Sequence, residues 1–137
     1  MHDDPFRGMN QTPVASSSGP VDPSVSEWER HYAMAMHLTL LASALLLPVI
    51  PVLVMYLIKR GESRFVDDHG REALNFQITQ LIYATVGFLL IPACGIGFVV
   101  LVAALVLAIV GMVLGAVAAN QRRYFRYPAC IRFLRAS

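Results

Sequence analysis

Two long stretches of this chain carry no charged side chain. The first runs from His31 to Ile58, which is 28 residues, and the second from Ala73 to Gln121, which is 49 residues. About 18 consecutive apolar residues are enough for a helix that spans a membrane. Of the 137 residues, 56% are hydrophobic and only 15% are charged, whereas soluble domains carry about 25% charged residues. The sequence therefore predicts an all-α integral membrane protein.

The second charge-free stretch is too long for one membrane span. As a single helix it would measure about 74 Å, more than twice a hydrocarbon core of about 30 Å. A proline and two glycines between Ile91 and Gly97 predict a turn near its middle. We therefore expect three transmembrane helices, at about residues 32–58, 73–92 and 97–119. Pro48 and Pro51 predict a kink in the first span, and the sequence leaves open whether they divide it into a hairpin.

The segments that flank these spans differ in composition. Residues 1–25 hold half of the eight prolines and few large apolar side chains, so we expect a disordered N-terminal tail. The helical membrane domain is expected at residues 26–135. Ser24 with Glu27, and Ser26 with Glu29, have the spacing of a capping box, which marks a helix start. The remaining predicted segments are a cytoplasmic loop at 59–72 and a basic, aromatic C-terminal tail at 120–137.

The basic residues are divided unequally between the two sides of the predicted bundle. With three spans, two of the 11 lie on the N-terminal side and nine on the other. The positive-inside rule then places the N-terminus outside and the loop and C-terminus in the cytoplasm. We therefore expect a multi-pass protein of the bacterial inner membrane. Because the basic residues face the membrane surface, the expected partner is the lipid bilayer and not nucleic acid.

A polar stripe leads into the second predicted span. On a helix, Asp68, Glu72, Asn75 and Thr79 share one face, which Tyr83 extends. We expect an interfacial amphipathic helix here that continues into the span, with its stripe turned toward neighbouring helices or a water-filled cavity. The alternative is a docking site for a polar or extended segment, lined by Phe65, Val66 and residues 124–127. The candidate interaction motif comprises Asp67, Asp68, His69, Arg71, Glu72, Asn75 and Gln77, with an Asp67–Arg71 ion pair.

The same region does not have the pattern of a metal or catalytic site. His69 lies beside Asp68 and Glu72, but the order differs from the repeated Glu-x-x-His ligands of di-iron bundles. His37 is expected across the membrane from His69, so the two histidines are not expected to share an ion. We expect no metal, no cofactor and no enzymatic activity. Cys94 and Cys130 are likewise expected on opposite sides, which excludes an intrachain disulfide between them.

The third predicted span has a face of small residues. They recur at three- and four-residue spacing, and Gly111 with Gly115 forms a GxxxG motif, which allows close backbone approach. The partner is either another helix of this chain or a second copy, so a homo-oligomer remains open. The predicted packing residues are Ala104, Ala108, Gly111, Gly115 and Ala119.

Three blocks of sequence together resemble a known family. They are Glu29-Arg30 with Ala33-Met34 and His37-Leu38, the run Phe65-Val66-Asp67-Asp68-His69-Gly70-Arg71-Glu72-Ala73-Leu74-Asn75-Phe76-Gln77, and Tyr124-Phe125-Arg126-Tyr127-Pro128. They resemble small bacterial membrane proteins of a domain-of-unknown-function family related to the membrane component of the chloroplast inner-envelope protein-import translocon (Tic). The resemblance covers about residues 29–134. It implies a polytopic helical membrane protein linked to a protein-conducting pore.

Two functions follow as expectations. The first is a structural, interaction or accessory component of membrane protein handling, with a membrane-protein partner. The alternative is an oligomeric pore or transporter subunit, which needs several copies because three helices enclose little water. A measurement of native size in mild detergent separates the two, because a strict monomer counts against the pore.

Overall fold

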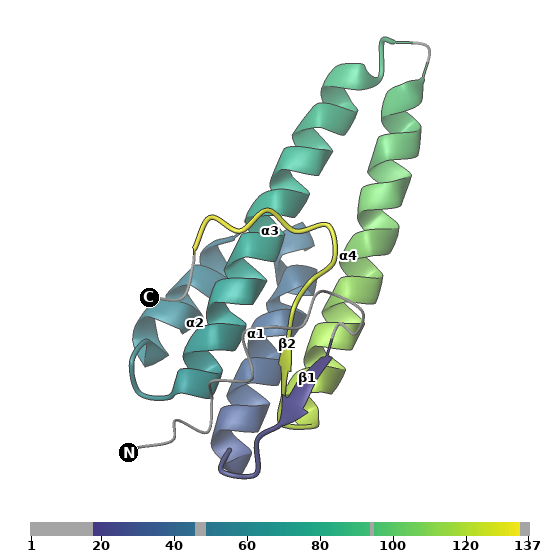
Figure 1. Cartoon of the computed structure of the whole chain (residues 1–137). Coiled ribbons are helices and arrows are strands. Elements are labelled where there is room, and N and C mark those ends of the chain that lie inside the picture. The colour runs from purple at the N-terminus through teal and green to yellow at the C-terminus, as the bar shows by residue number, and fades with distance from the viewer. Residues whose placement is uncertain (1–17, 46–48, 94, 135–137) are drawn as a thin grey trace, which may run out of the picture.

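The computed structural model describes residues 18–45, 49–93 and 95–134 (Figure 1). Within these residues the chain is mostly helical, as predicted, with four helices and a two-stranded sheet. The elements in chain order are β1 (Ser18–Val21), α1 (Glu27–Leu45), α2 (Ile50–Lys59), α3 (Arg64–Leu90), α4 (Ile96–Asn120) and β2 (Arg123–Phe125). Of the two predicted capping boxes, the one at Ser26 is confirmed, since its amide donates to Glu29 Oε2 at 2.7 Å.

The predicted first span is two helices and not one kinked helix. α2 runs back along α1, and the Tyr32 hydroxyl of α1 donates to the Met55 carbonyl of α2 at 2.7 Å. Pro51 lies in the first turn of α2, where a proline removes no helical hydrogen bond; Pro48 is outside the described residues. Val49 has a positive φ of 74°, which ends any helical path from α1. The 10 residues of α2 measure about 15 Å, half of a hydrocarbon core.

α3 and α4 form a second, longer hairpin. Both are long and apolar enough to cross a membrane, and among the described residues only these two helices are. α3 begins directly after Ser63, whose side chain accepts from the Val66 amide at 3.3 Å. The polar residues 64–72 and the predicted second span are therefore one continuous helix. The hairpin closes tightly at Gly97, where an added Cβ would lie 2.1 Å from the Gly87 carbonyl oxygen.

The two strands bring the ends of the described chain together. β1 pairs antiparallel with β2, with Val21 opposite Arg123, and the Asp22 amide donates to the Arg122 carbonyl at 2.8 Å. Hydrogen-bonded strands cannot lie on opposite sides of a membrane, so the predicted orientation, N-terminus outside and C-terminus inside, is not supported by the positions of residues 18–21 and 123–125. The cause is α2, which returns the chain to the side where α1 began. Residues 18–21, expected in a disordered tail, form a strand, and residues 1–17 lie outside the described part.

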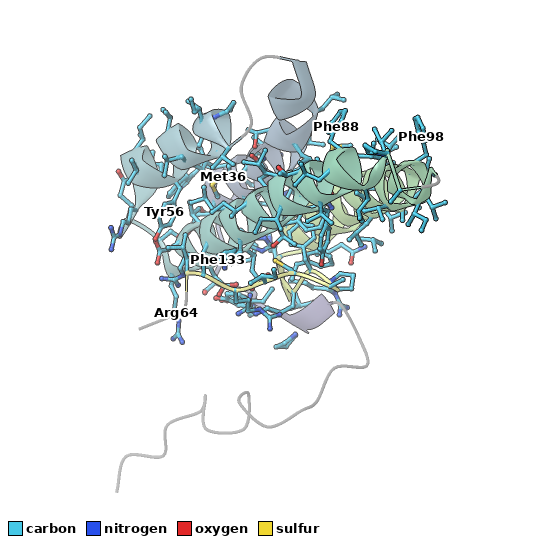
Figure 2. The ribbon with its side chains drawn as sticks, turned by 90° about the horizontal axis from the view of Figure 1, so that it is seen from above. Met36, Tyr56, Arg64, Phe88, Phe98 and Phe133 are labelled. Carbon is cyan, nitrogen blue, oxygen red and sulfur yellow. The ribbon has the colours of Figure 1, made fainter. Side chains whose placement is uncertain are left out.

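The packed core lies at the end of the molecule that carries the strands. Met36 and Tyr56 are buried there between the helices, whereas Phe88 and Phe98 lie at the far end of the long hairpin (Figure 2). Side chains at that far end are largely exposed: Phe88 is 65% and Leu89 is 74% exposed. Exposed apolar surface of this extent is typical of contact with lipid.

Candidate functional site

The polar stripe of α3 contacts the chain's own C-terminal segment, residues 126–134. This segment follows β2, leaves the strand and crosses α3 (Figure 1). The stripe residues Asp68, Glu72, Asn75, Thr79 and Tyr83 all have hydrogen bonds or ion pairs with it. The stripe therefore faces protein, as predicted, but the segment that lies on it belongs to the same chain. Docking of a partner at this motif stays a prediction.

Two carboxylates of α3 hold the arginines of this segment. Arg126 binds Asp68 through both of its terminal nitrogens, at 2.6 and 2.8 Å. Arg132 Nε donates to Glu72 at 3.2 Å, and the side chain of Glu72 is only 6% exposed. The hydrogen bond with Asp68 raises the pKa of Arg126. Paired, hydrogen-bonded charges of this kind fix the position of the segment on the helix.

Farther along α3, uncharged side chains bind the backbone of the segment. Asn75 Oδ1 accepts from the amides of Phe133 and Leu134 at 3.1 and 2.8 Å, and its Nδ2 donates to the Leu134 carbonyl at 2.9 Å. The Ile131 amide donates to Thr79 Oγ1 at 3.0 Å. The Tyr83 hydroxyl donates to the Ala129 carbonyl at 2.7 Å.

The contacts follow the spacing of the helix. Asn75, Thr79 and Tyr83 are four residues apart, which is about 6.0 Å along a helix. Their partners lie at every second position of an irregular segment, which has a turn at 128–129, a positive φ of 51° at Ala129 and a bend at 133–134. Successive turns of α3 therefore bind successive parts of this segment. Because the contacts are to main-chain atoms, the non-helical backbone of this segment is hydrogen-bonded by side chains of α3.

Two histidines and a tyrosine form a buried hydrogen-bonded chain beside the stripe. His37 Nε2 lies 2.7 Å from His69 Nδ1, and Tyr127 Oη lies 2.6 Å from His37 Nδ1. His69 Nε2 is 3.0 Å from the Arg123 carbonyl, which can only accept, so this nitrogen is the donor. In two neutral rings the order is then fixed: Tyr127 donates to His37, and His37 donates to His69.

The contact between His37 and His69 corrects an expectation. They were predicted on opposite sides of the membrane, but α1 and α3 both begin at the end that carries the strands. The sequence reasoning also missed His37 and Tyr127 as partners. The sequence shows a histidine inside an apolar stretch and a tyrosine at the end of the aromatic run 124–127. Neither feature predicts which residue the side chain contacts.

The small-residue face of α4 serves this same site. A Cβ added at Gly115 would lie 2.7 Å from His37 Nδ1 and 2.8 Å from Tyr127 Oη, and one at Gly111 would lie 2.7 Å from Phe76. The GxxxG motif thus faces side chains of its own chain. Of the other predicted packing residues, Ala119 is fully buried, and Ala104 and Ala108 line a cavity between α1, α3 and α4.

The remaining motif residues lie around this site. The predicted ion pair between Asp67 and Arg71 is confirmed, at 2.6 Å. Gln77 faces α1 and donates to Thr39 Oγ1 at 3.1 Å. Phe65 packs against Tyr124 at 5.4 Å between ring centroids, and burial, with the neighbouring Asp22 carboxylate, raises the pKa of Tyr124 to about 12.

Metal ligands do not cluster in the part of the chain that the structure describes. No group of three or more His, Cys, Asp or Glu side chains there could hold a metal ion. Cys130 is a free thiol, and Cys94 lies outside the described residues.

Fold and site together define a small, membrane-associated helical protein built from two apolar hairpins and held by its own C-terminal segment. Residues 28–134 match the magnetosome magnetite crystal formation family (MamF/MmsF), and the chain belongs to that family. No curated protein and no solved structure matches the chain. The predicted relationship to a chloroplast import translocon is therefore wrong, because the residues that carried the resemblance lie inside the magnetosome-family match. The expectation of an import-channel component rested on that relationship and is no longer supported.

Proposed function

We propose that this protein is a non-enzymatic structural or interaction component that supports magnetite crystal formation from one side of the magnetosome membrane. The observation that carries the proposal is the placement of charge. Both hairpins begin and end at the pole that bears β1 and β2, and the 49 residues from Ala73 to Gln121 contain no charged side chain. The turn between α3 and α4 therefore offers no charged group to the opposite side.

The charged pole is proposed to face the cytoplasm. All described Lys and Arg residues lie at this pole, and basic residues are retained on the cytoplasmic side of bacterial membranes. Basic residues at a membrane surface also attract anionic headgroups, at about 1 kcal/mol each. In this arrangement the protein contacts the lipid bilayer along both hairpins and presents its polar surface to cytoplasmic partners.

A structural role is favoured over catalysis by the use of the titratable groups. His37 and His69 each engage both ring nitrogens within the chain, and Asp68 and Glu72 are paired with arginines. A general acid or base needs an atom that reaches a substrate. The polar atoms of these groups are instead hydrogen-bonded or ion-paired within the chain, chiefly to the C-terminal segment and β2.

Cysteine labelling tests the proposed arrangement. In a chain with Cys94→Ala and Cys130→Ser, single cysteines replace Ser24, Gln121 and Ala93 in turn. We expect an impermeant thiol reagent to label the first two from the cytoplasmic face only, in inside-out vesicles, and not to label the third from that face. Labelling of Ser24→Cys and Gln121→Cys from opposite faces would overturn the proposal.

The role in mineral formation is tested in magnetosome-forming cells that lack this chain. We expect the full-length protein to restore the size and number of magnetite crystals seen by electron microscopy. We expect His37→Gln to restore them as well, provided that the variant accumulates to the same level, because a structural role requires the fold and not proton transfer. Loss of crystals with a fully folded His37→Gln protein would indicate chemistry at this histidine.

A further inference from the structure

The two hairpins reach different distances from the charged pole. The α1–α2 hairpin follows α3 as far as the contact between Thr39 and Gln77, at 3.1 Å, and the neighbourhood of Ala84. Among the described elements, only α3 and α4 continue past this level, and they extend well beyond the others (Figure 1). α4 has 25 residues, whereas α1 has 19 and α2 has 10, which correspond to about 37, 28 and 15 Å. The short hairpin, whose longer arm is α1, thus reaches about three quarters as far as the long one.

The lone part of the long hairpin is suited to hydrocarbon. Its exposed large side chains are all apolar: Val86, Phe88, Leu89, Ile96, Phe98 and Val99. The backbone of its turn is bonded internally, since the Ala93 amide donates to the Leu90 carbonyl and the Ile96 amide to the Ala93 carbonyl, both at 3.1 Å. Irregular backbone is tolerated at membrane depth only when its polar groups are bonded in this way.

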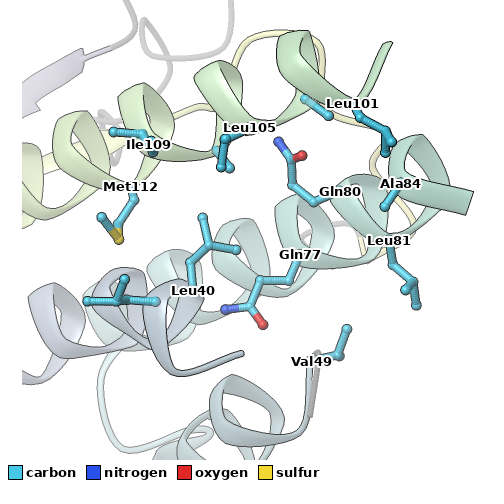
Figure 3. Close-up of a pocket in the computed structure, with 13 residues that line it drawn as sticks. Leu40, Val49, Gln77, Gln80, Leu81, Ala84, Leu101, Leu105, Ile109 and Met112 are labelled. Carbon is cyan, nitrogen blue, oxygen red and sulfur yellow. The ribbon is translucent and has the colours of Figure 1, made fainter. Parts of the chain in front are cut away.

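The step between the two hairpins is hollow. A cavity of about 340 Å³ lies where the short hairpin ends, between Leu40, Val49, Leu81, Leu105 and Ile109 (Figure 3). Only Gln77 and Gln80 contribute polar side chains to its lining. An engineered apolar cavity of about 150 Å³ already binds benzene, so this hollow has room for part of a lipid acyl chain.

We propose that the protein is a wedge whose preferred partner is a strongly curved bilayer, with the leaflet at the charged pole on the convex side. This inference rests on the proposed membrane-embedded arrangement and adds a shape to it. Near the charged pole the cross-section contains four helices, and near the α3–α4 turn it contains two. With a helix diameter of about 10–12 Å, the two additional helices occupy roughly 200 Å² more in one leaflet than in the other. A convex leaflet accommodates such an excess, whereas a flat bilayer must compress its lipids.

Vesicles of two sizes test the wedge directly. Full-length protein in mild detergent is added to preformed vesicles of phosphatidylethanolamine and phosphatidylglycerol, so that the charged pole stays outside on the convex leaflet. The vesicles are floated, and the protein-to-lipid ratio is measured for diameters of about 30 and about 400 nm. We expect a ratio about threefold higher on the small vesicles, since insertion of partly embedded amphipathic elements depends on curvature.

A variant of the short hairpin separates the wedge from membrane insertion in general. Val54 and Leu57 lie on the exposed face of α2, so Val54→Glu with Leu57→Glu removes α2 from hydrocarbon without a change in the core. We expect this variant to float through α3–α4 but to lose the preference for small vesicles. The matched control, Val54→Leu with Leu57→Ile, should keep it. Circular dichroism confirms that each variant retains its helices.

The outcomes distinguish the two proposals. Wild-type protein that fails to float with either vesicle size would overturn the membrane-embedded arrangement and the wedge with it. Flotation with equal ratios on small and large vesicles would overturn the wedge alone. Should the glutamate variant lose its helices, the comparison of the two vesicle sizes with wild-type protein still decides the matter.

Discussion

The side-chain amide of Asn75 forms hydrogen bonds to the backbone of the C-terminal segment that a neighbouring strand would otherwise provide. Its side chain accepts two backbone amides and donates to one carbonyl of residues 133–134. A side-chain amide offers an acceptor oxygen and two N–H donors without carrying a charge. The end of the described chain is thereby held without a charge at this depth.

We expect Asn75→Leu to destabilise the protein by about 1–3 kcal/mol, although it makes the helix more apolar, because partly buried backbone groups lose their partners. Asn75→Asp retains the acceptor contacts and should cost less. Thermal unfolding in detergent and hydrogen exchange of the Phe133 and Leu134 amides measure the effect. A stability equal to or above that of wild type, with unchanged exchange, would contradict this role.

Tyr127 combines ring packing with hydrogen bonding, and the two contributions can be separated. Its ring stacks on Phe76 at 3.8 Å between centroids, and its hydroxyl is the donor to His37. Tyr127→Phe keeps the stack but leaves a buried acceptor unpaired, so we expect a loss of about 1–3 kcal/mol in the free energy of unfolding. Tyr124→Phe is the matched control, because its hydroxyl contacts the half-exposed Asp22 at 3.2 Å. Equal effects of the two substitutions would count against the buried chain.

Among the elements, α3 carries three kinds of surface in sequence along its length. Its first turns hold charged residues against the C-terminal segment, its middle holds amide and hydroxyl groups against backbone, and its last turns are apolar. The segment is bound mostly through α3 side chains, so its position depends on the charge pairs at one end of the stripe. This dependence is open to a charge-exchange experiment.

We expect Arg126→Glu and Asp68→Lys each to loosen the C-terminal segment, because each places like charges together. The double variant should recover part of the loss, with a coupling energy of about 0.5–1 kcal/mol, since the arginine end of the pair is half-exposed and screened. The rate of trypsin cleavage at Arg132 reports release of the segment. If the double variant is cleaved as fast as the single ones, the pair does not hold the segment.

At the scale of the whole molecule, the β1–β2 pairing follows from the two helical hairpins and shows that both ends of the described chain lie at one pole. Two helical hairpins of any length return the chain to its starting side, and the strand pair joins the two ends there. The uneven division of basic residues disappears in this arrangement, because the described basic residues all lie at the same pole.

The strand pairing predicts a specific cross-link. Val21 and Arg123 are opposite each other in the antiparallel pair, where Cα atoms lie about 4.5–5.5 Å apart, within the range of a disulfide. We expect Val21→Cys with Arg123→Cys, in a chain without Cys94 and Cys130, to form an intrachain disulfide when isolated membranes are oxidised. A shift in electrophoretic mobility without reductant detects it, and Val21→Cys with Gln121→Cys is the control outside the register. No cross-link in membranes that contain folded protein would contradict the shared side.

Much of the local structure could be predicted from the sequence. The charge-free stretches predicted apolar helices, the proline and glycines near residue 95 predicted the turn between α3 and α4, and the capping box predicted the start of α1. The periodicity of Asp68, Glu72, Asn75 and Thr79 predicted a polar face that must find protein. These features depend on residues close in sequence, so propensity and spacing are sufficient to define them.

The identity of the partners was decided only by the tertiary structure. A proline pair is compatible with a kinked span or with a hairpin, and the two alternatives place His37 on opposite sides of the membrane. Side-chain packing favours the hairpin, because α2 buries Val52 and Tyr56 against its neighbours. The chain thereby returns to the charged pole. From that one choice follow the β1–β2 pair, the contact of His37 with His69 and the docking of the C-terminal segment on α3. Each joins residues between 32 and 107 positions apart, from His37 and His69 to Ser18 and Phe125, and no local pattern specifies a contact at that separation.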